Sequence, residues 1–200
     1  AAAELTGTIY MVAAGKAAWQ MAKAASDALA GRIAAGVVVT KYDHVMGEIP
    51  NTVCVEAGHP VPDENSFRGT QAALDLVAKA GAGDTVLFLL SGGGSALFEK
   101  PRIPAEELQD ITGQLLASGA DIVEMNTIRK RLSAVKVGRF AQLCAQAKVF
   151  SIVLSDILGD PLDMIASGPA VPDSSTCEQA LAIVKKYDLK LSDAAMQLLH

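Results

Sequence analysis

The sequence predicts an α/β protein: a three-layer, Rossmann-like domain with a mostly parallel sheet and helices on both faces. Half of the 200 residues are hydrophobic but only 4% are aromatic. An apolar content made largely of alanine, valine and leucine favours helices layered on a parallel sheet over a β-sandwich. Short β-rich runs also alternate with longer helical segments along the chain, which is the pattern of repeated βα units.

Five short apolar runs, most of them rich in β-branched residues, are the expected strands. Their hydrophobicity is continuous rather than alternating, which is typical of strands covered on both faces. The expected strands are residues 8–13, 37–40, 53–55, 85–90 and 149–154. We therefore expect each of them to lie between two helical layers.

Helical segments separate and follow these strands. The expected helices are residues 17–30, 67–79, 104–117, 122–131, 138–146 and 177–187, with a further helix beginning near Asp193. Ser175 and Glu178 have the spacing of a capping box at the start of the helix over 177–187. Internal repeats and low-complexity linkers are absent, so residues 1–200 are expected to form a single domain.

The composition excludes several classes of protein. The 17 lysines and arginines against 22 aspartates and glutamates give a net charge of −5, so the overall basic charge of a nucleic-acid-binding protein is absent. No apolar run approaches the ~20 residues that cross a bilayer, and the N-terminus lacks a signal-peptide pattern. Three widely spaced cysteines without a Cys-x-x-Cys pair argue against a disulfide framework or a zinc site and favour a reducing, cytoplasmic location.

The first segment that could carry chemistry is Gly15-Lys16, directly after the first expected strand. In a parallel sheet the loops leaving the carboxyl ends of the strands form the binding crevice, so segments in this position are expected to converge. Lys16 falls in the first turn of the next helix, where the helix dipole disfavours a cation. Its place is understandable if Lys16 and the free N–H groups of the helix face a bound anion. The alternative is a solvated lysine after a turn.

The second segment is the glycine loop, Ser91-Gly92-Gly93-Gly94-Ser95, which follows the most apolar strand. Three successive glycines in a strand-to-helix turn expose backbone N–H groups, and the two serine hydroxyls add donors, so the loop is a candidate anion-binding nest. It is not a Walker A loop, and the chain contains no G-x-G-x-x-G dinucleotide fingerprint. The alternative is a flexible glycine loop.

The third segment is basic. Five of the 17 basic residues lie within residues 129–139, without an intervening acid, and they include Arg129, Lys130 and Lys136. In a chain of negative net charge this concentration favours a bound polyanion. Because no aromatic residues are interleaved to stack on bases, a small polyanion such as a nucleoside triphosphate fits better than nucleic acid. A solvated helix end is the alternative.

Two acidic or polar loops complete the candidate site. Asp156 and Asp160 follow the last expected strand and could share Mg²⁺, which takes one or two carboxylates and completes its shell with water and phosphate oxygens. The alternative is that they form turns. Glu56 and His59, in the proline-containing loop after the third strand, are candidate substrate contacts, although a lone loop histidine is more often a surface residue.

Together these segments resemble the ordered motif set of the glycerate 2-kinase family, the type II glycerate kinases, whose members are also labelled hydroxypyruvate reductases. The resemblance runs from about Met11 to Asp173. The motifs that carry it are AAGKAAWQMA, EAGHPVPDENS, LLSGGGSALFEKP, EMNTIRKRLSAVKVGRFA and LSDILGDPLDMIASGPAVPD. It implies ATP- and Mg²⁺-dependent phosphorylation of D-glycerate to 2-phosphoglycerate, in a cleft between a Rossmann-like N-terminal domain and a second, C-terminal domain.

The resemblance also implies roles for individual residues. Lys16 and Asp156 become the catalytic residues, and Asp156 with Asp160 the acidic, metal-binding motif. The glycine loop becomes the phosphate cradle. The basic segment supplies Arg129, Lys130 and Lys136 to the phosphates.

The sequence departs from the family pattern in two ways. Val137 and Phe140 stand where the family's basic segment usually has glycine and leucine, and a positive φ would be unfavourable at a β-branched residue. The chain also lacks the second domain, so we expect an N-terminal kinase domain truncated at both ends. Two alternatives to an active kinase stay open: a hydroxypyruvate reductase, and a catalytically silent nucleotide-binding fragment.

Overall fold

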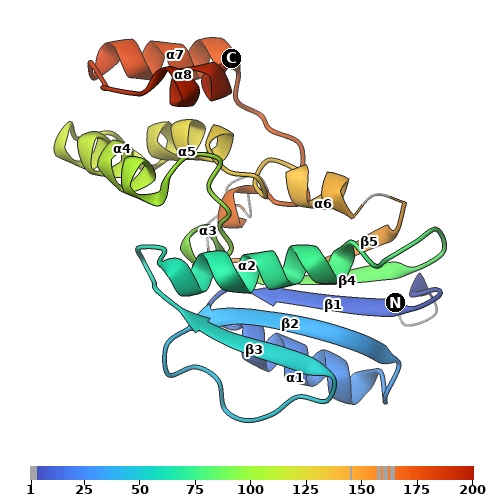
Figure 1. The fold of residues 1–200 in the computed structure, drawn as a ribbon. Helices are drawn as coiled ribbons and strands as arrows, with labels where there is room; N and C mark the ends of the chain where they lie inside the picture. Colours follow the sequence, from blue (N-terminus) through green and yellow to red (C-terminus); the bar gives the residue numbers. More distant parts are fainter. Residues whose placement is uncertain (1–3, 145, 157–158, 160–161, 163–164) are drawn as a thin grey trace.

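A five-stranded parallel sheet forms the centre of the computed structural model, which describes residues 4–144, 146–156, 159, 162 and 165–200. The strand order is β3-β2-β1-β4-β5, and every neighbouring pair is parallel (Figure 1). The strands are β1 (Ile9–Ala14), β2 (Ile33–Lys41), β3 (Thr52–Ala57), β4 (Thr85–Ser91) and β5 (Lys148–Leu154). The predicted α/β class and parallel sheet are confirmed.

Helices form at all the predicted places. They are α1 (Ala18–Ala28), α2 (Glu64–Val77), α3 (Gly94–Leu97), α4 (Ala105–Ala117), α5 (Ile122–Arg131), α6 (Arg139–Leu143), α7 (Cys177–Lys186) and α8 (Asp193–Leu199), with a 3₁₀ turn, η2, at Ile165–Ser167. The sequence pattern missed α3 and η2, which are too short to show a helical period, and it made α6 longer than it is.

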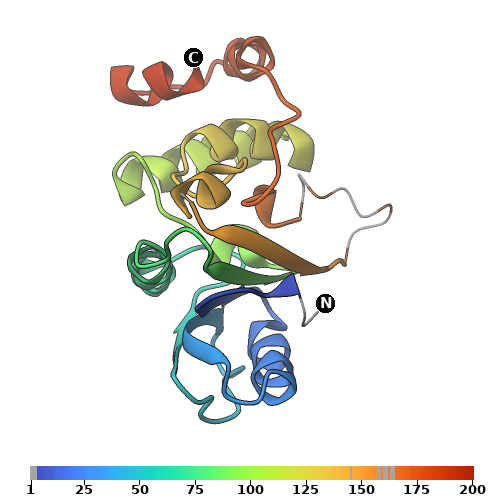
Figure 2. The same cartoon turned by 90° about the vertical axis from the view of Figure 1, so that its right-hand side faces the viewer.

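The two faces of the sheet bury separate cores because successive strand residues point to opposite sides. Met11 and Leu87 belong to the core on the side of α1. Val12 and Phe88 belong to the core on the side of α2, where Phe88 packs 4.5 Å, centroid to centroid, from Phe140. Figures 1 and 2 show α1 (blue) and α2 (green) on opposite sides of the strands. The predicted three layers are thus confirmed.

Four helices do not cover the sheet but pack on one another. Helices α4, α5, α7 and α8, hereafter the helical lobe, share a third core that includes Ile111, Leu115, Ile128 and Leu199. Both views show this lobe on the opposite side of the sheet from α1 (Figures 1 and 2). The sequence pattern did not separate these helices from those on the sheet, because both kinds carry one apolar stripe. The lobe provides the opposite wall of the site described below.

Two predictions need correction. The edge strands β3 and β5 are not covered on both faces: Val53 of β3 is 59% exposed, and Ile152 and Leu154 of β5 are 47% and 53% exposed. The capping box of α7 lies one residue later than expected. The Thr176 hydroxyl accepts from the backbone N–H of Gln179, and the backbone N–H of Thr176 donates in return to the Gln179 side-chain oxygen, whereas Ser175 donates to the Asp173 carboxylate. Among the described residues, no helix is both long and apolar enough to cross a membrane.

Candidate functional site

The loops after β1 and β4 interlock at the centre of the sheet. The chain leaves β1 toward β2 and leaves β4 toward β5, so this is the switch point where α/β proteins place their ligand crevice. The backbone N–H of Lys16 donates to the Gly92 carbonyl (2.8 Å), and that of Ala17 donates to the Ser91 hydroxyl (3.0 Å). Ser91 is 2% exposed, so its hydroxyl braces the two loops rather than facing the crevice.

Lys16 meets Asp156 at the rim of this crevice, although 140 residues separate them. The Lys16 Nζ lies 3.3 Å from Asp156 Oδ2, and the two side chains are 43% and 51% exposed. An ion pair this open to water contributes little to stability. Both charges are therefore available to a ligand that replaces the pair.

Two glycines of the loop lie directly against these side chains. A methyl group added at Gly92 would collide with the Asp156 carboxylate, and one added at Gly93 would lie 3.0 Å from both the His59 imidazole and the Lys16 side chain. Gly93 also has φ = +84°, which favours glycine. We refer to Lys16, His59, Gly92, Gly93 and Asp156 as the rim cluster. Glycine is required here for close approach, in addition to exposing the backbone.

The third glycine faces inward. A methyl group at Gly94 would come within 2.5 Å of the Ala166 Cβ. Ala166, Ser167 and Gly168 have successive positive φ values of 50°, 61° and 61°, and the Ser167 hydroxyl lies 3.0 Å from the Ser95 hydroxyl. This strained segment supports the glycine loop from below. The sequence carried no signal for this segment, because no residue pattern marks three consecutive left-handed residues of which only one is glycine.

Lys136 is buried beneath the loop rather than exposed at its surface. Its Nζ donates to the carbonyls of Ser95 (2.8 Å) and Phe98 (3.0 Å) and lies 3.5 Å from Glu99 Oε2, and both charged side chains are 1% exposed. Burial lowers the pKa of the Lys136 ammonium, the charge of Glu99 opposes that shift, and the charge of Arg129 adds to it. In the described residues neither Glu99 carboxylate oxygen has a hydrogen-bond partner. Lys136 thus fixes the end of the glycine loop from the interior.

The other two basic residues differ from each other. Lys130 is 2% exposed, and its Nζ lies 3.7 Å from Asp173 Oδ1. Arg129 lines the cleft next to the rim cluster, and its buried Nε has no hydrogen-bond partner among the described residues. Of the three predicted phosphate ligands in the basic segment, only Arg129 faces the cleft in this structure.

The two predicted substrate contacts also separate. Glu56 accepts a hydrogen bond from the backbone of His44 (3.2 Å) and does not line the cleft. His59 does line it, and burial lowers its pKa, with the charges of Lys16 and Lys41 acting in the same direction. The imidazole is thus favoured in its neutral form near pH 7.

The predicted metal ligands are Asp156 and Asp160. Asp160, the second predicted metal ligand, lies outside the described residues. The described residues contain no group of three or more histidine, cysteine, aspartate or glutamate side chains that could hold a metal ion by themselves. The half-exposed Asp156 carboxylate does fit the coordination of Mg²⁺, which takes one or two carboxylates when phosphate oxygens and water supply the remaining ligands.

The rim cluster opens into a cleft of about 850 Å³ between the sheet and the helical lobe. Gly92, Gly93 and Asp156 line its sheet side, and Asn126 and Arg129 of α5 line the other side. This volume lies within the range of roughly 300–1,000 Å³ that is typical of small-ligand sites. Asn126 was not predicted as a site residue, because in the sequence it is an ordinary residue of a predicted helix.

The fold and the position of the cleft define a doubly wound α/β protein with a ligand crevice at its switch point. More particularly, the chain belongs to the family described as "Domain of unknown function (DUF4147)", whose model matches residues 1–200.

Named relatives are similar over most of this chain. D-glycerate 2-kinase of Thermotoga maritima is 56% identical over 188 residues, covering 93% of this chain and 45% of the relative. The crystal structure of glycerate kinase from Thermotoga maritima has a TM-score of 0.94 and 53% identity, covering 99% of this chain and 48% of that one. A putative hydroxypyruvate reductase of Agrobacterium vitis is 40% identical over 96% of this chain and 44% of the relative. The chain spans less than half the length of these relatives.

Proposed function

We propose that this chain carries the nucleotide-binding and catalytic rim of a glycerate 2-kinase, which transfers phosphate from ATP to the 2-hydroxyl of D-glycerate. The observation that carries the proposal is the convergence of the Lys16 ammonium, the Gly92-Gly93 backbone and the Asp156 carboxylate at one rim. The name of the relative at 56% identity, D-glycerate 2-kinase, supports the same reaction, and the structure at 53% identity is named glycerate kinase.

The geometry suits phosphoryl transfer because that reaction needs positioning and charge rather than covalent help from the protein. Lys16 would release Asp156 and offset the negative charge that develops on the moving phosphoryl group. The glycine loop would donate backbone N–H groups to the phosphate oxygens, and Arg129 would add a cation from the opposite wall. Lys130 and Lys136 would support the phosphate site from the interior.

Mg²⁺ would be held by Asp156, with Asp160 as the proposed second ligand, and when bound it would neutralise charge on the phosphates. His59, which contacts the rim next to Gly93, is the proposed contact for D-glycerate. Glu56 would act through the loop that it anchors, by accepting from the backbone of His44. The cytoplasm is the proposed location, in keeping with three free cysteines.

Two alternatives compete with an active kinase. A hydroxypyruvate reductase would need a nicotinamide site, and the sequence has no dinucleotide fingerprint in the loop after any strand. A silent nucleotide-binding fragment is consistent with the share of the relatives' length that the chain spans. In an active kinase, a second domain from the remaining part of the relatives' length would close the cleft.

The test compares ligands first and turnover second. We expect Mg·ATP to raise the unfolding temperature of the chain and NADH to leave it unchanged, because only a bound ligand stabilises the folded state. Stabilisation by NADH without stabilisation by Mg·ATP would overturn the proposal in favour of the reductase. Formation of 2-phosphoglycerate from D-glycerate and Mg·ATP, followed by ³¹P NMR, then distinguishes an active kinase from a silent fragment.

A further inference from the structure

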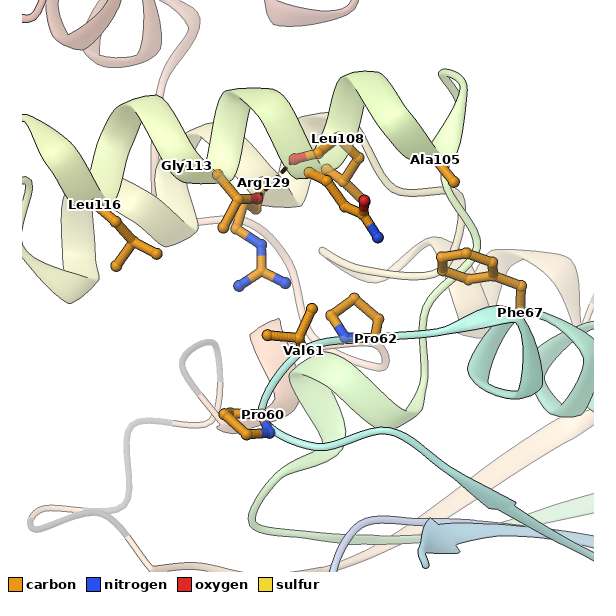
Figure 3. Close-up of a pocket in the computed structure, with 11 residues that line it drawn as sticks. Pro60, Val61, Pro62, Phe67, Ala105, Leu108, Gly113, Leu116 and Arg129 are labelled. Carbon is orange, nitrogen blue, oxygen red and sulfur yellow. Dashed lines mark hydrogen bonds between the residues drawn. The ribbon is translucent and has the colours of Figure 1, made fainter.

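A second, apolar hollow opens beside the rim cluster. It has a volume of about 380 Å³ and lies between the proline-containing loop after β3 and helix α4 (Figure 3). Pro60, Val61 and Pro62 form one wall. Leu108, Gly113 and Leu116 of α4 belong to the other, and we call this hollow the apolar slot.

The slot is continuous with the cleft. Pro60, Val61, Leu116 and Arg129 line both. The same loop also reaches the phosphate end of the site, because the His59 ring lies against Gly93. A single ligand can therefore occupy the glycine loop with one end and the apolar slot with the other.

The two ends of this continuous site have opposite chemistry. At the rim, Lys16, Asp156 and the glycine backbone offer charge and donors. In the slot most of the lining is apolar, with Gln109, Thr112 and Arg129 as its polar side chains, and Val61 and Leu116 are 61% and 63% exposed. D-glycerate is small and polar and would gain nothing from such walls. A nucleoside triphosphate carries a polyanion at one end and a flat, largely apolar heterocycle at the other, which matches both ends.

Arg129 lies where the two ends join. Figure 3 shows its side chain reaching between α4 and the loop that carries Val61 and Pro62. The planar guanidinium can stack on a heteroaromatic ring while its N–H groups face phosphate oxygens. Arg129 lines both the slot and the cleft, so one side chain can contact both ends of the same ligand.

A glycine inside helix α4 keeps the slot open. Gly113 lies in the middle of α4, where glycine weakens a helix relative to other residues. A methyl group added there would meet no atom within 4 Å, so the absence of a side chain is not explained by packing. Its exposed face is the slot.

We propose that the apolar slot between residues 60–62 and helix α4 is the subsite for the nucleobase of the triphosphate donor. This inference rests on the proposed kinase function and adds to it the place of the base. The walls contain few groups that can read hydrogen-bonding edges, so the slot selects by shape, and ATP and GTP are expected to bind with similar affinity.

The test fills the slot without disturbing the fold. Gly113→Leu removes a helix-weakening residue and places its side chain in the slot, so the folded state is expected to keep its stability. Ala117→Leu is the matched control, since Ala117 is an exposed residue of the same helix that does not line the slot. A second variant, Leu116→Ala, removes part of the wall at an exposed position. Isothermal titration of the full 200-residue chain with Mg·ATP and with inorganic tripolyphosphate gives the readout.

We expect Gly113→Leu to weaken Mg·ATP binding about tenfold and Leu116→Ala to weaken it about threefold, because the base loses apolar burial. Both should leave tripolyphosphate binding unchanged, and Ala117→Leu should leave both ligands unchanged. Unchanged Mg·ATP affinity in the two slot variants would overturn the base subsite while leaving the proposed function intact. Equal weakening of Mg·ATP binding and tripolyphosphate binding would also overturn the base subsite. Absence of binding of either ligand to the unmodified chain would overturn the proposed function itself.

Discussion

Two lysine–carboxylate pairs lie against the glycine loop, one at its rim and one beneath it. Lys16 and Asp156 are 3.3 Å apart with side chains 43% and 51% exposed. Lys136 and Glu99 are 3.5 Å apart and both 1% exposed. The two pairs join the same residue types at similar distances, so burial is the property that separates them.

The two pairs have different roles because they differ in burial. Water screens the rim pair, which can open at little cost when a ligand arrives. The buried pair has lost its hydration, and breaking it leaves an uncompensated charge in the interior. The first pair is therefore suited to exchange with a ligand, and the second to holding the carbonyls of Ser95 and Phe98 in place. Four tests probe this comparison.

The largest effect is expected for Lys136→Met. It leaves the Glu99 carboxylate buried without its cation and removes the donor to two carbonyls, so the free energy of unfolding should fall by about 3–5 kcal/mol. Denaturant unfolding measures this change. Lys136→Met with Glu99→Leu should recover part of the loss, and the remainder reports the two carbonyls. A loss below about 1 kcal/mol for Lys136→Met would contradict an anchoring role for the buried pair.

The glycines provide the second test, because Gly92 faces the exposed rim and Gly94 faces the interior of the same loop. Gly94→Ala places a methyl group against the buried Ala166 and should lower stability by about 1–3 kcal/mol. For Gly92→Ala the three nearest atoms all belong to the half-exposed Asp156 carboxylate, which can turn away, so this substitution should cost less. Thermal unfolding of both variants gives the order. A larger loss of stability for Gly92→Ala than for Gly94→Ala would show that the Asp156 carboxylate at the rim cannot turn away.

The sheet could be predicted well from the sequence because its central strands are short, continuous apolar runs, which are stable only when they are buried. Val86 and Leu87 read as buried strand residues, and they are. The convergence of Lys16, the glycine loop and Asp156 could also be predicted, because the loops after parallel strands lie at one edge of the sheet.

Burial of charged residues could not be predicted in the same way. Lys136 and Arg129 stand in one basic run, yet one is interior and the other lines the cleft. Which of them faces a ligand depends on the turn at Val137 and on the carbonyls that the fold presents to Lys136, and neither is local in sequence. The apolar slot was equally hidden, because its walls come from two distant segments. Gly113, a glycine inside a helix, was the one local signal.

The third test concerns binding rather than stability. Lys16→Ala removes an exposed cation, so stability should change by less than about 0.5 kcal/mol. The affinity for Mg·ATP should fall about tenfold, since Lys16 is proposed to face the phosphates. Lys23→Ala is the control, because Lys23 forms a similarly exposed pair with Asp27 within helix α1, away from the glycine loop. Equal ligand affinity for the two variants would remove Lys16 from the site.

The smallest effect is expected next to the buried lysine. Val137 has φ = +54°, a conformation that strains a β-branched residue, and its N–H donates to the Ser167 carbonyl (3.1 Å), which holds it there. Val137→Gly should raise the free energy of unfolding by about 0.5–1 kcal/mol, since relief of strain exceeds the added freedom of the unfolded chain. Val123→Gly, at an exposed position within α5, should instead lower it. If Val137→Gly lowered stability as Val123→Gly does, the positive φ at Val137 would not be a source of strain.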